Sequence, residues 1–309
     1  MDENERVLEG EKIGILGKGG AGKSTLVVLV ASALRERAYA VCVLDADSTN
    51  IGMHRALGVD RAPVPLIDYF GGMVFSGGLV TCPVDDPAPL AGAELVLEEL
   101  PQEYVARTPE GISLLLAGKI AGLGPGAGCD GPVAKIARDL KLRAPEKAPV
   151  MVVDFKAGFE DSARGVITGL DRAILIVDPT TASVEMAADL RDMVFQIKAG
   201  GLPATKHLHS PTLVALANQV FREAAIKDVA IVLNKVQNEE VEGYLRERLA
   251  EKGIEPIATI PEDAGVSTSW LKGLPIDISR LRDAGRKIID TLEASKARHL
   301  APKEKARSR

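Results

Sequence analysis

The feature that most constrains this chain is a glycine-rich segment, Gly17-Lys-Gly-Gly-Ala-Gly-Lys-Ser-Thr25, which lies between a short apolar run and an apolar helical pattern. From its first glycine to its serine, the segment fits the phosphate-loop pattern G-x-x-x-x-G-K-[ST]. Glycines let the backbone curl around a polyphosphate with N–H groups pointing inward, and the following helix places its positive end beneath the phosphates. In this pattern Lys23 reaches the β- and γ-phosphates and Ser24 holds Mg²⁺. A plain glycine-rich turn would not need strand, loop, Gly-Lys-Ser and helix in this order. The predicted phosphate-binding residues are Gly17, Lys18, Gly19, Gly20, Ala21, Gly22, Lys23, Ser24 and Thr25.

Short apolar runs alternate with amphipathic helical patterns along the chain, and this predicts an α/β fold with a doubly wound, mostly parallel sheet flanked by helices. Hydrophobic residues make up 46% of the sequence but aromatic residues only 4%, as in sheets packed by aliphatic side chains. The predicted strands are 12–16, 40–44, 112–116, 150–153, 172–177, 229–233 and 256–260. The predicted helices are 23–37, 132–140, 162–170, 183–199, 239–251 and 276–296.

Acidic residues follow two of the predicted strands, at the edge where ligands bind in such sheets. Asp45-Ala-Asp47 follows one strand, and a carboxylate there can hold a Mg²⁺-bound water or orient an attacking water. Asp154 ends another strand, as in a Walker B motif, and would contact Mg²⁺ through water. Gly158, just beyond it, can offer its N–H to the γ-phosphate. Each acid alone can also be a helix cap or a turn residue.

A third group of residues suits a purine base. Asn234, followed by Lys235, ends a predicted strand with an amide that both donates and accepts hydrogen bonds, which fits the adenine edge. The N-K-x-D pattern of guanine binders is missing, because Gln237 stands where its aspartate would be.

The second lysine of the loop, Lys18, has no role in an ordinary phosphate loop. With it, Lys18-Gly-Gly-Ala-Gly-Lys-Ser24 resembles the deviant Walker A motif of the MinD/ParA/nitrogenase-iron-protein ATPases. The resemblance implies ATP/ADP as ligand, hydrolysis of ATP, and a homodimer in which Lys18 reaches the partner's nucleotide. It gives Asp47 the role of orienting water, so Lys18, Lys23, Asp47 and Asp154 are the candidate catalytic residues, and Ser24, Asp47 and Asp154 the candidate Mg²⁺ ligands. It also places Asn234, Lys235 and the segment Pro261, Glu262 and Asp263 at the base.

From about residue 11 to 294 the chain further resembles the CooC-type ATPases, which insert nickel into carbon monoxide dehydrogenase and related enzymes. The matching segments include Leu66–Gly72, Leu100–Tyr104 and Gly126–Pro132. The resemblance implies a client metalloenzyme. The chain departs from it in having one cysteine, Cys129, where those proteins have Cys-x-Cys. A symmetric dimer would then offer two Cys129 thiolates, with Asp130 as a possible further ligand, to Ni²⁺ or Zn²⁺ at the interface.

Composition and charge set the remaining expectations. The net charge of −5 argues against a general nucleic-acid surface, the acidic start is unlike a signal peptide, and no apolar run reaches the ~18 residues of a membrane span. We therefore expect a cytoplasmic protein with no strong nucleic-acid or membrane signal. A MinD- or ParA-type ATPase that positions cargo on membrane or DNA is the alternative function.

We expect an N-terminal extension over residues 1–10, one ATPase domain over 11–295 with an insertion at about 60–109, and a basic, disordered tail over 296–309. Cys42 is expected inside a strand as a buried apolar residue. Cys82 lies in the insertion, where it could be exposed without an activating neighbour. His207 and His209 form a weak metal candidate on a loop.

Overall fold

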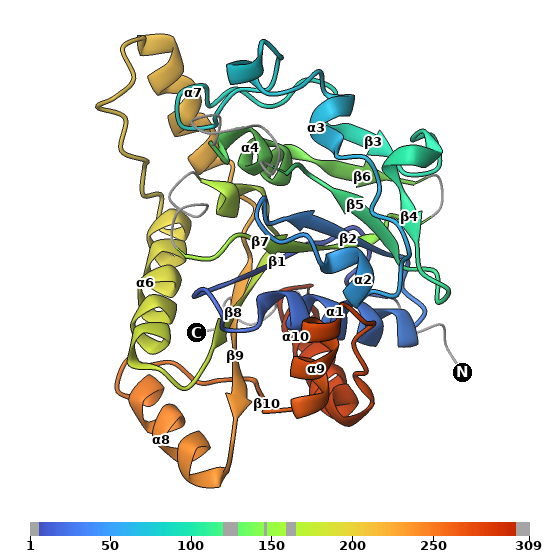
Figure 1. The fold of residues 1–309 in the computed structure, drawn as a ribbon. Helices are drawn as coiled ribbons and strands as arrows, with labels where there is room; N and C mark the ends of the chain where they lie inside the picture. The colour runs from blue at the N-terminus through green and yellow to red at the C-terminus, as the bar shows by residue number, and fades with distance from the viewer. Residues whose placement is uncertain (1–5, 120–128, 145–146, 159–164, 301–309) are drawn as a thin grey trace.

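The computed structural model describes residues 6–119, 129–144, 147–158 and 165–300, with side chains to residue 296. A sheet of eight strands runs through the middle of the molecule in the order β10-β9-β8-β1-β7-β2-β5-β4 (Figure 1). All neighbouring pairs are parallel except β4–β5, which is antiparallel. The predicted fold class is therefore confirmed.

The strands of this sheet are β1 (Lys12–Gly17), β2 (Val41–Ala46), β4 (Ala106–Arg107), β5 (Ser113–Leu116), β7 (Val150–Phe155), β8 (Arg172–Val177), β9 (Asp228–Val236) and β10 (Ala258–Pro261). A second, two-stranded sheet pairs β3 (Glu94–Val96) with β6 (Lys141–Arg143). The helices are α1 (Lys23–Glu36), α2 (Met53–Ala56), α3 (Leu66–Tyr69), α4 (Gly131–Asp139), α6 (Thr181–Lys198), α7 (Pro211–Arg222), α8 (Glu239–Ala250), α9 (Ala264–Lys272) and α10 (Arg282–Leu300). In the described part of the chain, no helix is both long and apolar enough to cross a membrane.

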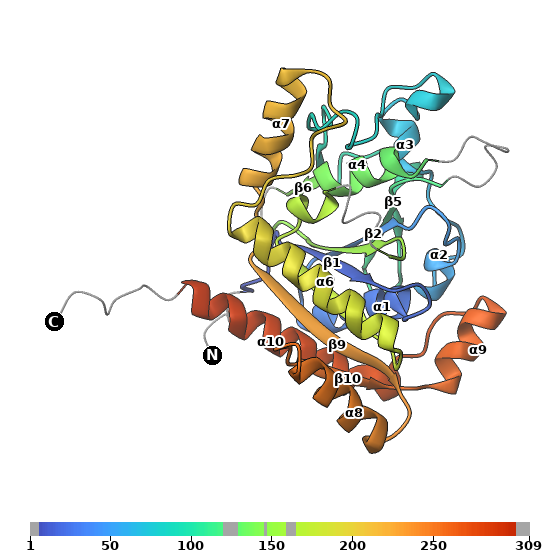
Figure 2. The ribbon, with the colours of Figure 1, turned by 90° about the vertical axis from the view of Figure 1, so that its left-hand side faces the viewer.

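Different helices cover the two faces of the sheet (Figure 2). α1 and α10 pack on one face, and α4, α6 and α8 pack on the other. Because successive side chains of a strand point to opposite faces, Val41 and Val43 join the core beneath α1, whereas Cys42 and Leu44 join the core beneath α4. Cys42 is completely buried there, as expected.

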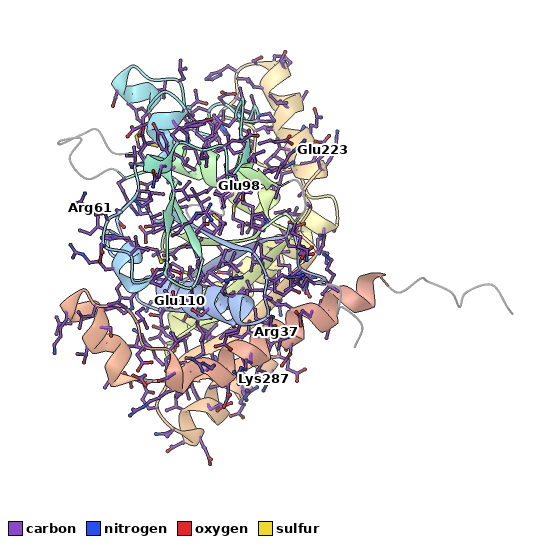
Figure 3. All side chains as sticks on the ribbon, turned by 90° about the vertical axis from the view of Figure 1, so that its right-hand side faces the viewer. Arg37, Arg61, Glu98, Glu110, Glu223 and Lys287 are labelled. Atoms are coloured by element: carbon purple, nitrogen blue, oxygen red, sulfur yellow. The ribbon has the colours of Figure 1, made fainter. Side chains whose placement is uncertain are left out.

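The end of α1 is tied to α10 by charge. Arg37 lies against α10, where its guanidinium pairs with Asp290 and Glu293, and Figure 3 shows this edge of the molecule with Arg37 and Lys287. Tyr39, just beyond, donates its hydroxyl to Glu293 at 2.8 Å. These contacts fix the helix that follows the phosphate loop against the last helix of the chain.

Some of the expected helices differ from the structure. Of the predicted helix 162–170, the described part holds only a 3₁₀ turn, Val166–Gly169, and residues 162–164 lie outside the described ranges. α7 and α9 were not expected. α7 carries an apolar stripe but buries only Ala217, and α9 buries no residue. The segment 60–109 does lack a long helix, and its chain folds over the α4 side through α3 and β3.

Candidate functional site

The glycine-rich segment forms a tight loop between β1 and α1. Gly17 has a φ of 144°, and a Cβ atom there would lie 2.7 Å from the carbonyl oxygen of Ile176. Gly22 has a φ of 100°, and its Cβ would lie 2.2 Å from Nδ2 of Asn234. Both positions therefore require glycine. Lys23 begins α1, is buried, and folds back so that its Nζ donates to the carbonyl of Lys18 at 3.3 Å.

Two acids meet beside this loop because β2 and β7 are neighbours. The parallel register places Asp45 opposite Asp154. Ser24 donates its hydroxyl to Oδ2 of Asp154 at 2.7 Å, and Asn50 donates to the Ser24 hydroxyl at 2.9 Å. Asp154 is 0% exposed, and its Oδ1 has no hydrogen-bond partner among the described residues. A buried carboxylate oxygen without a partner, next to a serine hydroxyl, is a fitting ligand set for Mg²⁺.

Burial raises the pKa values of both acids above those of exposed carboxyl groups. Burial raises the pKa of Asp154 to about 7, and the neighbouring charge of Asp45 adds to the rise. Burial also raises the pKa of Asp45 to about 6, against the opposing charge of Lys119. A bound cation would stabilise the ionised form of both carboxyl groups, so this pair favours cation binding.

Lys119 is a site residue that we did not expect from the sequence. It lies just after β5, and its Nζ contacts Oδ2 of Asp45 at 2.7 Å and the carbonyl of Asp47 at 2.5 Å. Its ammonium group thus holds the start of the 45–50 loop. No local sequence signal could have revealed it, because the contact depends on β5 lying beside β2 in the sheet.

The carboxylate of Asp47, the candidate for orienting water, is turned to its own loop. Its Oδ1 accepts from the backbone N–H and hydroxyl of Thr49, at 2.9 and 2.7 Å, and from the N–H of Asn50 at 3.2 Å. Asp47 is therefore a turn residue in this arrangement, and these hydrogen bonds engage its Oδ1.

Two further loop contacts bear on the expected roles. The N–H of Gly158 donates to the carbonyl of Gly17 at 3.2 Å, so it bonds to the phosphate loop itself. Nζ of Lys18 lies 3.5 Å from the hydroxyl of Thr180 and 3.9 Å from Oδ2 of Asp178. About a third of the Lys18 side chain is exposed.

The residues expected at the base also contact the loop. Asn234 is buried and donates its amide to the carbonyl of Ala21 at 2.7 Å. Lys235 has a φ of 57°, which is strained for a side-chain-bearing residue, and donates to the carbonyl of Gly20 at 2.8 Å. Both residues therefore stabilise the phosphate loop through its backbone carbonyl groups.

The segment after β10 closes the same end of the site. Pro261 and Glu262 are exposed, and Asp263 caps α9 by accepting from the N–H groups of the next turn. From α9, Trp270 donates its ring N–H to the hydroxyl of Thr25 at 2.9 Å. This contact was not expected, since nothing in the sequence pattern links the two.

Asp130 connects the site to Cys129. The buried carboxylate of Asp130 accepts from the hydroxyl of Ser48 at 2.6 Å and pairs with the ammonium of Lys156. Ser48 belongs to the loop after Asp45, and Lys156 follows Asp154. The sequence suggests Asp130 as a further metal ligand, but both of its carboxylate oxygens are engaged by Ser48 and Lys156.

Cys129 is partly exposed, and its sulfur accepts from the N–H of Gly131 at 3.3 Å. Within residues 6–119, 129–144, 147–158 and 165–300, no group of three or more His, Cys, Asp or Glu side chains is placed to hold a metal ion. His207 contacts the carbonyl of Val84 at 3.0 Å. Gly126 to Gly128 lie outside the described residues.

Several known proteins are similar to this chain. The chain is 35% identical over 187 residues to an uncharacterised ATP-binding protein of Methanocaldococcus jannaschii, a match covering 59% of this chain and 72% of that protein. It is 24% identical to the carbon monoxide dehydrogenase accessory protein CooC of Rhodospirillum rubrum, over 85% of this chain and 88% of that one. The septum site-determining protein MinD of Pyrococcus horikoshii, solved with Mg-ADP, superposes with a TM-score of 0.54 at 18% identity, covering 93% of this chain and 98% of the other.

Residues 15–276, which include the phosphate loop, both acids and Asn234, match the family described as the CobQ/CobB/MinD/ParA nucleotide binding domain. With its glycine-rich loop, paired acids and parallel sheet, the chain belongs to this family and is a nucleotide-binding ATPase.

Proposed function

We propose that the chain binds ATP and ADP with Mg²⁺ at this site, and that two protomers associate across ATP. The support for Mg²⁺ is the oxygen set of Ser24 and Asp154, in which Oδ1 of Asp154 is buried and has no partner in the part of the chain that the structure describes. The ion would supply charge to neutralise the phosphates, while Lys23 and the loop N–H groups hold them. The related MinD of Pyrococcus horikoshii was solved with Mg-ADP, which agrees with this choice.

Lys18 is our candidate for the contact between protomers. Its side chain is about one-third exposed, and its ammonium lies 3.5 Å from Thr180 and 3.9 Å from Asp178 in the β8–α6 turn, so these long contacts hold it weakly. A lysine at this place can reach a nucleotide held by a facing protomer. Asp47 would orient the attacking water.

We further propose that this switch assists the maturation of a nickel- or iron-containing enzyme, as a CooC-like protein. The observation that carries the proposal is the contact of Asp130 with both loops that follow the acids, through Ser48 and Lys156. A change at the γ-phosphate that moves either loop acts on Asp130, and therefore on its neighbour Cys129. ATP hydrolysis would thus change the position and surroundings of the Cys129 thiol.

The metal ion, Ni²⁺ or Zn²⁺, is cargo in this proposal. One protomer does not assemble enough ligands for it in the described residues, so we assign the site to two Cys129 thiolates across the homodimer, completed by water or by the client. The similarity to CooC over 85% of the chain supports a client of the carbon monoxide dehydrogenase kind.

Metal analysis of the purified protein tests this role. The protein is loaded with Ni²⁺ or Zn²⁺ in the presence of ADP, of ATP, or of no nucleotide, and bound metal is counted per dimer. We expect about one metal ion per dimer that depends on nucleotide, and its loss in Cys129→Ala with ATP binding unchanged. Equal metal content in wild type and Cys129→Ala would refute the assignment.

A positioning ATPase is the second candidate. Residues Val74, Phe75 and Leu79 on one turn are 43%, 50% and 79% exposed, and an apolar turn of this kind can enter a membrane surface or a partner. Co-sedimentation with vesicles of anionic lipid, and with duplex DNA, in ATP and ADP tests it. ATP-dependent binding to either would favour this candidate over metal delivery.

A further inference from the structure

Two cysteines that are 47 residues apart in the sequence meet at one glycine. A Cβ atom added to Gly131 would lie 2.5 Å from Sγ of Cys82 and 2.6 Å from its Cβ, so Cys82 occupies the space where a side chain would be. On the same residue, the N–H of Gly131 donates to Sγ of Cys129 at 3.3 Å. Both sulfur atoms therefore lie against Gly131, at the start of α4.

The turn that carries Cys82 is held on α4 by a second contact. Lys135 is buried, and its Nζ donates to the hydroxyl of Thr81 at 2.7 Å and to Oδ2 of Asp86 at 3.0 Å. Gly131 and Lys135 are four residues apart and so lie on the same side of the helix. The position of Cys82 beside Gly131 is thus fixed from both ends of the 81–86 turn.

The surroundings of the two thiols differ in a useful way. Cys82 is 7% exposed, and burial raises the pKa of its thiol although the N–H groups of Val84 and Asp85 oppose this. The charge of Cys129 raises the same pKa, as expected for neighbouring sulfurs. Cys129 is partly exposed, so a reagent in solution reaches it first.

We propose that Cys82 and Cys129 are a modification site, a thiol pair that closes to an intramolecular disulfide by exchange with a small-molecule disulfide. The Cys129 thiolate attacks one sulfur of the reagent, the reagent's S–S bond breaks, and one small thiol leaves as a mixed disulfide forms. Cys82 then loses its proton and attacks Sγ of Cys129, and the second small thiol leaves. The two protein thiols are oxidised by two electrons, and one reagent molecule is reduced to two thiols.

The modification acts where the ATPase loops converge. Asp130 lies between Cys129 and Gly131 in the chain and contacts Ser48 and Lys156. A disulfide ties the 81–86 turn to this point and withdraws the Cys129 sulfur from any other ligand. The thiol chemistry itself does not rest on the proposed metal role, because it needs only the two sulfurs and the reagent.

Thiol counting on the full chain tests the proposal. The reduced protein is treated with glutathione disulfide, quenched in acid, unfolded and titrated for free thiols, and the peptides are identified by mass spectrometry. We expect the loss of two of the three thiols, a Cys82–Cys129 cross-linked peptide without bound glutathione, and a free Cys42, whose thiol is completely buried in the reduced protein. Dithiothreitol should restore all three.

The Cys82→Ser variant is the matched control, since it keeps the size of the side chain but removes the resolving thiol. In it, glutathione should remain on Cys129. The proposal is overturned if wild-type protein also retains glutathione on Cys129 while Cys82 stays open to alkylation, or if the only disulfides join separate chains.

Discussion

The buried acid pair predicts that removing one charge stabilises the protein while it destroys the activity. Asp154 is 0% exposed, and its pKa rises from the usual 3.8 to about 7. The native protein therefore binds this proton more tightly than the unfolded chain does. The stability that the proton provides is complete below pH 3.8 and is lost as pH rises through 7.

The size of the effect follows from the shift. About three pKa units at ~1.4 kcal/mol each give an upper bound of ~4 kcal/mol for the cost of ionised Asp154 above pH 8. Asp45 titrates together with Asp154, and charges inside proteins are screened more strongly than a low dielectric constant implies. We therefore expect the free energy of unfolding to change by about 2 kcal/mol between pH 5 and pH 8. In Asp154→Asn, an amide oxygen can still accept from Ser24, but no charge forms.

Urea unfolding at pH 5 and pH 8 measures the free energy of unfolding of both proteins, with EDTA present to remove divalent metal ions. The difference in free energy of unfolding between Asp154→Asn and wild type should shift by about 2 kcal/mol in favour of the variant from pH 5 to pH 8. Effects of altered packing or of the amide N–H cancel in this double difference. Asp283→Asn, at a fully exposed side chain of α10, is the control that should show little shift. A difference that does not change with pH would refute the burial argument.

Three other changes probe the nucleotide site. Lys23→Ala should lower ATP turnover by about 100-fold or more, because it removes the cation at the phosphates, and a phosphate-release assay at saturating ATP measures it; turnover near wild type would contradict its role. Asp47→Ala should keep ATP bound and sediment as a dimer, whereas Asp47→Ala with Lys18→Gln should bind ATP and stay monomeric in analytical ultracentrifugation. Asn234→Ala should weaken ATP binding by roughly tenfold through the lost 2.7 Å contact to the loop. If Asn234 also reads the base, competition will show that wild type prefers ATP to GTP and that the variant does not; equal affinity of wild type for both would remove it from base recognition.

The sequence by itself determined the sheet and the phosphate loop. Both depend on neighbours in the chain: a strand, glycines with positive φ and a helix start form one continuous segment, and aliphatic runs of four to six residues mark each parallel strand. All seven expected strands form within two or three residues of their expected bounds. The acids at strand ends, Asp45 and Asp154, meet because parallel strands end at one edge.

The tertiary structure alone decided which side chains share a contact across long stretches of chain. Lys119 reaches Asp45 only because β5 lies beside β2, and Asp130 joins Ser48 to Lys156 only because α4 begins above both loops. The sequence suggested that Cys82 could be exposed, yet it is buried beside Gly131 and near Cys129. Sequence periodicity cannot predict this contact. It depends on Gly131 having no side chain, which leaves the space that the sulfur of Cys82 fills.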